Sequence, residues 1–82
     1  MNHTQAIREI MILRNVTLAE LGNRLGMSHV GVIHRITSKA GRIDTILQIL
    51  EALGYEIVVR PWTEGELPEG EYALRSRDYP TT

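Results

Sequence analysis

The fold of this 82-residue chain is decided by residues 18–37, which read Leu-Ala-Glu-Leu-Gly-Asn-Arg-Leu-Gly-Met-Ser-His-Val-Gly-Val-Ile-His-Arg-Ile-Thr. The first part predicts a helix, because Leu18, Leu21 and Leu25 recur at the period of an amphipathic α-helix. Thr17 precedes this helix as an N-cap, whose hydroxyl can accept a backbone hydrogen bond. Gly26 ends it, since glycine adopts a positive φ without a Cβ penalty.

A second short helix follows this glycine turn. Ser28 is its predicted N-cap, and Val32 and Ile36 face inward at positions i and i+4. Two helices joined by a turn of three to four residues form a helix-turn-helix, whose second helix enters the major groove of DNA. We therefore expect this chain to bind DNA through its second short helix.

Helices are also expected on both sides of this unit. One should run over about residues 4–14, which present a wide apolar face, and another over about residues 42–53 before Gly54. The latter has the cleanest apolar stripe of the chain, formed by Ile43, Ile46, Leu47, Leu50 and Leu53. The expected fold is mainly α, with a four-helix DNA-binding domain at residues 1–54.

Residues 55–62 predict a β-strand that takes part in dimerisation. The segment is rich in β-branched and aromatic residues and places Tyr55, Ile57 and Val59 on one side. A lone strand needs a partner, either the same strand of a second subunit or residues 71–76 returning as a hairpin. The dimer interface is predicted at Tyr55, Ile57, Val58, Val59 and Arg60, and residues 63–82 are predicted to form an acidic loop and tail.

The composition of the chain limits which kinds of cross-link, metal site and cellular location can be expected. The chain has no cysteine, so disulfides and thiolate metal sites are absent. No stretch approaches ~18 apolar residues, from which we expect a cytoplasmic protein without membrane contact. Residues 1–54 carry a net charge of +2, and residues 55–82 carry a net charge of −3. A mildly basic helical part agrees with a modest, dimer-dependent affinity for phosphate. A charge of +2 is equally explained by ordinary variation in composition.

The sequence lacks the residue groupings that usually indicate catalysis or metal binding. It contains no grouping of Ser, His and Asp with suggestive spacing and no glycine-rich phosphate loop. His29 and His34 are five residues apart, so on a helix they point about 140° apart and do not share a metal ion well. We expect no enzymatic activity, no cofactor and no metal site.

The outward side of the second short helix carries the predicted base-reading residues. Imidazoles can donate to guanine, and aliphatic side chains can contact thymine methyls. An outward isoleucine beside an outward valine is unusual for a solvated face, so packing against the first helix or against a partner is the alternative explanation. The predicted set is Ser28, His29, Val30, Ile33, His34 and Thr37.

Three further residues are candidate phosphate contacts. Thr17 stands at the N-terminus of a helix, where free N–H groups can bind phosphate, although it can equally be only a cap. Lys39 and Arg42 flank the next loop, and each can equally be an ordinary solvated charge. Gly31 lies within a helix at a cost of ~1 kcal/mol relative to alanine, which suggests a close approach of the preceding helix or of a DNA backbone.

Residues 4–60 resemble the XRE/Cro family of lambda-repressor-like helix-turn-helix regulators. The resemblance rests on Leu21, Gly22, Leu25, Gly26, Met27, Ser28 and Val32, with Gly22 at a position the family keeps small for helix packing. Residues 50–61 are similar to members whose last strand forms an intersubunit sheet, and the DNA-reading positions of the family fall on the outward set above. Two departures are Leu18, where many relatives have a phosphate-contacting glutamine, and Arg35, at a usually inward aliphatic position.

We therefore expect a bacterial or phage transcriptional regulator, a repressor, that binds double-stranded DNA at an inverted repeat as a homodimer. The alternative is the antitoxin of a toxin–antitoxin pair, in which the acidic C-terminal segment contacts the toxin, although this segment can also be only a solubilising linker. A helix-turn-helix used only for protein contacts is a third option.

Overall fold

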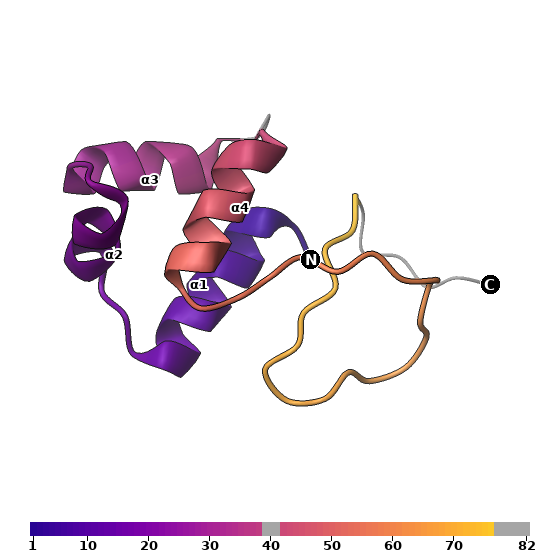
Figure 1. The fold of residues 1–82 in the computed structure, drawn as a ribbon. Helices are drawn as coiled ribbons and strands as arrows, with labels where there is room; N and C mark the ends of the chain where they lie inside the picture. The colour runs from indigo at the N-terminus through magenta and orange to yellow at the C-terminus, as the bar shows by residue number, and fades with distance from the viewer. Residues whose placement is uncertain (39–41, 77–82) are drawn as a thin grey trace.

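A computed structural model describes residues 1–38 and 42–76 and contains four helices (Figure 1). They are α1 (His3–Arg14), α2 (Leu18–Leu25), α3 (His29–Thr37) and α4 (Ile43–Ala52). α2 packs on α3 and α4, and α1 packs on the same two helices. The predicted mainly α fold is confirmed. None of the helices in the described ranges is long and apolar enough to cross a membrane.

Local capping determines where the helices of the central unit begin and end. The Thr17 hydroxyl accepts the Glu20 N–H at 3.1 Å, and Gly26 closes α2 in the left-handed region at φ 69°. Ser28 then begins α3 by accepting the Gly31 N–H at 3.2 Å. These three predictions are confirmed. α1 ends on Asn15 at φ 55°, a left-handed conformation that asparagine tolerates better than most residues.

The core lies between all four helices. Ile7, Leu21, Val32 and Ile49 are its largest fully buried side chains, one from each helix. In α4 the buried stripe is Ile46, Ile49 and Leu50, and it continues onto the C-cap Leu53 at a helical period. The predicted stripe was wrong at Ile43, which is 64% exposed because it is the first residue of α4 and extends past the end of the core.

Gly22 marks the closest approach of α2 to the turn and to α3. A Cβ there would lie 2.8 Å from the Met27 carbonyl oxygen and 3.4 Å from the Val32 side chain. At Gly31 the three atoms nearest to an added Cβ would belong to Ser28, at 3.3 Å, and to Met27, rather than to α2, while close approach of a DNA backbone there stays a prediction.

The prediction of strands at residues 55–62 and 71–76 was wrong, since the described residues form neither strand. Among the described residues, 71–75 make no backbone hydrogen bond to residues 55–62; the Arg75 N–H donates to the Met1 carbonyl at 2.9 Å, and Glu71 meets Arg60 only as an ion pair at 3.5 Å. A single extended segment without a neighbouring strand leaves its backbone groups unpaired and gains no sheet hydrogen bonds. Tyr55 and Ile57 pack on the core, whereas Val59 is 96% exposed and does not share their side.

The C-terminal segment is nevertheless held to the helices by side chains. The Tyr55 hydroxyl donates to the Gly70 carbonyl at 3.0 Å, and Tyr72 packs against the core. The Arg75 guanidinium stacks 3.8 Å from the centre of the Trp62 ring and donates to the Thr63 carbonyl at 2.9 Å. Figure 1 shows this segment looping out on the side of the bundle opposite α2.

Candidate nucleic-acid interface

One side of α3 is buried and the other is open to solvent. Val32 and Ile36 anchor the helix in the core, at 0% and 2% exposure, so the opposite side faces outward. Every residue of the predicted base-reading set is exposed: Ser28, His29, Val30, Ile33, His34 and Thr37. Because α2 packs behind α3, this side is presented on a rigid support.

The two imidazoles are available for contacts. His29 and His34 are exposed on α3, and neither imidazole makes a hydrogen bond to another residue of the described ranges. The expectation that both point into solvent is therefore met, and the alternative of packing against α1 does not apply to them. A neutral imidazole offers one donor and one acceptor, which suits a polar base edge.

The two hydroxyls of the set are partly engaged within α3. The Ser28 oxygen accepts the Gly31 N–H as an N-cap, so its own hydrogen remains free to donate. The Thr37 hydroxyl donates to the Ile33 carbonyl at 2.8 Å, so its oxygen remains free to accept. Ser28 can thus offer a donor and Thr37 an acceptor without losing their helical roles.

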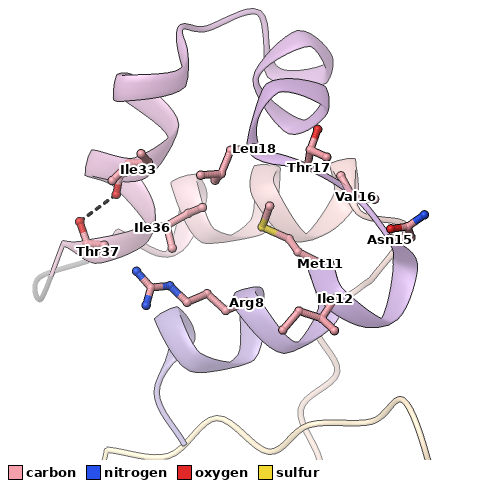
Figure 2. A pocket seen from close by; sticks show the side chains of 10 residues that line it. All are labelled: Arg8, Met11, Ile12, Asn15, Val16, Thr17, Leu18, Ile33, Ile36 and Thr37. Carbon is pink, nitrogen blue, oxygen red and sulfur yellow. Dashed lines mark hydrogen bonds between the residues drawn. The ribbon is translucent and has the colours of Figure 1, made fainter.

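The aliphatic residues of the set lie in different surroundings. Val30 is 76% exposed, whereas Ile33 is 38% exposed and turned toward α1. Ile33 lines a groove there together with Ile12 of α1 (Figure 2). The alternative of packing against the first helix therefore applies to Ile33 in part.

Thr17 is occupied by its capping box. Its hydroxyl lies 3.1 Å from the Glu20 carboxylate, and that carboxylate also accepts the Thr17 N–H at 3.4 Å. The negative charge of Glu20 therefore already stands at the N-terminus of α2, where a phosphate would bind. This arrangement accounts for Thr17 as a cap, while its contact with a phosphate stays a prediction.

The basic candidates differ in position. Arg42 pairs with Asp44 at 3.3 Å between exposed side chains, an interaction weak enough to be exchanged for a phosphate. Arg35, at a position that is usually inward and aliphatic in the family that the sequence resembles, is exposed on α3. Lys39 lies outside the described residues. Within those residues, no three His, Asp or Glu side chains are grouped so that they could hold a metal ion.

Arg8 is a candidate that the sequence analysis missed. Its side chain extends from α1 toward the C-terminal end of α3, over the groove that Ile33 lines (Figure 2). The available signal was the spacing of Thr4, Arg8 and Ile12, which occupy one stripe of α1 at i, i+4 and i+8. The sequence does not show that this stripe of α1 faces α3; the hydrogen bond from the Thr4 hydroxyl to the Ile36 carbonyl shows it.

Comparisons of the chain with protein-family models, with curated proteins and with solved structures found no match in any of the three.

Proposed function

We propose that this protein is a sequence-specific DNA-binding regulator that reads its operator with α3. The observation that carries the proposal is the exposed side of that helix, which combines two imidazoles, two aliphatic side chains and two hydroxyls. α2 and the core behind it hold the helix in place. A helix of this kind, supported by a second helix across a short turn, is the arrangement with which a helix-turn-helix reads the major groove.

The chemistry of the side chains suits base edges more than a solvated surface. His29 and His34 can donate to the N7 or O6 atoms of guanine, and Val30 and Ile33 can contact the methyl group of thymine. The exposed cations Arg35, on α3, and Arg42, the N-cap of α4, could contact phosphates beside the groove. Phosphate contacts of this kind make binding depend on salt.

In this proposal the protein binds an inverted repeat as a homodimer. Val58 is 68% exposed, Val59 is 96% exposed and Trp62 is 52% exposed, so the segment after α4 carries apolar surface that a second copy could cover. This contact does not require the strand pairing predicted from sequence. Two-fold symmetry would place the two α3 helices about 34 Å apart, and a bound dimer would repress by excluding polymerase.

Selection from random-sequence duplexes, at two salt concentrations and followed by sequencing, tests the proposal. Enrichment of an inverted repeat with half-sites about 10 base pairs apart is expected, with weaker recovery at the higher salt. His29→Ala and His34→Ala should each lose part of the motif, whereas the control Gln48→Ala, on an exposed position of α4, should keep it. Absence of any motif and of any binding at low salt would refute the proposal.

A further inference from the structure

An open groove of about 550 Å³ runs between α1, residues 15–18 and the C-terminal half of α3 (Figure 2). Its walls are apolar and are formed by Met11, Ile12, Val16, Leu18, Ile33 and Ile36. Ile12 is 77% exposed, so this apolar surface is in contact with water. The volume is within the range of sites that bind small organic molecules.

A single formal charge lies among the residues that line this groove. It is the guanidinium of Arg8, which reaches over the apolar walls from α1 (Figure 2). The guanidinium of Arg8 makes no hydrogen bond or ion pair with another residue of the described ranges, so all of its side-chain donors remain available. No aspartate or glutamate lines the groove.

The other polar side chains that line the groove carry no charge. At the end away from Arg8, the Thr17 hydroxyl is held by Glu20 and Asn15 offers a neutral amide; beside Arg8, the Thr37 hydroxyl donates its hydrogen to the Ile33 carbonyl (Figure 2). A ligand therefore gains most of its polar interaction at Arg8 and most of its buried area from the aliphatic walls. Apolar burial and one cation together select a molecule with one anionic end and an apolar body.

We propose that the groove binds a small amphiphilic carboxylate, with the carboxylate on Arg8 and the hydrocarbon chain along Ile12, Leu18 and Ile33. The charge complementarity disfavours a neutral hydrocarbon, which would leave the guanidinium beside it without a counter-charge. A multiply charged phosphate is disfavoured as well, since the aliphatic walls provide no second cation.

Binding at this groove would control the DNA interface, a consequence that rests on the proposed function. Ile33 and Thr37 belong both to the groove and to the outward side of α3. A chain lying on Ile33 occupies the surface that would meet a thymine methyl, and a carboxylate near α3 repels the phosphates. The carboxylate and DNA therefore compete, and each lowers the affinity for the other by the same factor.

Octanoate and 1-octanol, which share an alkyl chain length and differ in charge, test the site by NMR titration of the whole protein without DNA. Saturable amide shifts at residues 8, 12, 33 and 37 are expected, with tighter binding of octanoate. Arg8→Gln should weaken octanoate binding about fivefold and leave octanol binding unchanged. Ile12→Ser, at an exposed position, should weaken both ligands about fourfold for each methylene left uncovered.

Two matched variants outside the groove serve as controls. Arg35→Gln removes another exposed arginine and Leu74→Ser another exposed apolar side chain, and both should bind octanoate as the unmodified protein does. Absence of saturable octanoate binding, equal affinity for octanol, or equal loss in the control variants would overturn the proposal. If Arg8→Gln weakens DNA binding while octanoate does not bind, Arg8 is a phosphate contact instead.

Competition with DNA is measured separately. Octanoate should lower the affinity of the unmodified protein for its selected duplex, and a higher octanoate concentration should be needed for the same effect on Ile12→Ser. Octanoate binding in a protein that binds no duplex would refute the proposed function and leave the carboxylate site standing. Simultaneous binding of octanoate and DNA without mutual effect would refute the coupling.

Discussion

The hydroxyl of Thr4 donates a hydrogen bond to the carbonyl oxygen of Ile36, which joins the first turn of α1 to the last turn of α3. This carbonyl is among the last four of α3, which have no partner within the helix. α1 thus caps the C-terminal end of the helix that carries the proposed recognition surface, and it also places Arg8, one turn further along, beside that end.

Removing this hydroxyl should destabilise the protein. Thr4→Val keeps the shape of the side chain but leaves the partly buried Ile36 carbonyl without its partner, at an expected loss of about 1–2 kcal/mol in the free energy of unfolding. Urea unfolding followed by circular dichroism measures the change. Thr4→Ser keeps the hydroxyl and should recover most of the stability. Equal stability of Thr4→Val and the unmodified protein would show that the bond contributes nothing.

Two glycines of the central unit should respond to alanine in opposite ways. Gly22→Ala places a methyl group 2.8 Å from a backbone carbonyl that cannot move freely, so a loss of about 1–3 kcal/mol is expected. Gly31→Ala meets side chains rather than backbone, the Ser28 hydroxyl at 3.3 Å and Met27 at 3.9 Å, and gains up to about 1 kcal/mol of helix propensity. Chemical unfolding of both variants checks the difference, and a similar loss in the two would contradict it.

The exposed side of α3 should tolerate a charge without loss of stability. Val30 is 76% exposed, so Val30→Asp is expected to change the free energy of unfolding by less than about 0.5 kcal/mol. The same carboxylate should abolish DNA binding, because it would stand against the phosphates and bases of the groove. Gln48→Glu adds equal charge on α4 and should bind DNA nearly as before. Fluorescence anisotropy with the selected duplex separates the two variants, and equal loss in both would mean that total charge is responsible.

The segment after α4 should control the mass of the protein in solution. Val59→Asp changes a side chain that is 96% exposed, so the fold should persist while the proposed dimer dissociates. Sedimentation equilibrium should then give a monomer at concentrations where the unmodified protein is dimeric, and Val58→Pro should do the same. Val30→Asp is the reciprocal control and should remain dimeric. An unchanged mass in both variants of the segment would exclude dimerisation through it.

Tyr72 should make stability depend on alkaline pH. Partial burial raises the pKa of its phenol above 10.0, and the nearby Tyr55, Glu9 and Glu69 raise it further. The folded state therefore favours the neutral phenol, and the resulting stabilisation is complete below pH 10.0 and is lost as the pH rises through the raised pKa. Tyr72→Phe should flatten this part of the decline in urea unfolding between pH 9 and pH 11. An identical pH profile for the variant would contradict the assignment.

Helix ends were the features most accessible from sequence, because each depends on a few neighbouring residues. The roles of Thr17, Gly26 and Ser28 follow from hydrogen bonds and backbone conformations within four positions. The inward side of α3 follows in the same way from the spacing of Val32 and Ile36. The exposure of the predicted base-reading set is the consequence of that local pattern.

The sequence alone was less informative where two helical stripes fitted equally well, or where an element needed a neighbouring segment to form. Ile43 and Ile49 both fit a helical stripe in α4, and only the position of the core decides that Ile49 is buried and Ile43 is not. The β-propensity of residues 55–60 is strong, yet a strand requires a neighbour, and the described residues 71–75 offer this segment no backbone hydrogen bond.

By itself, then, the sequence determined four helices, their caps and the outward face of α3, because these depend on contacts a few residues apart. Tertiary structure alone decided that α1 lies beside the end of α3, which brings Arg8 and Ile12 next to Ile33 and Thr37 and opens the groove between them. The physical reason is that this surface joins residues about 25 positions apart, and the packing of the helices on a shared core determines which faces meet.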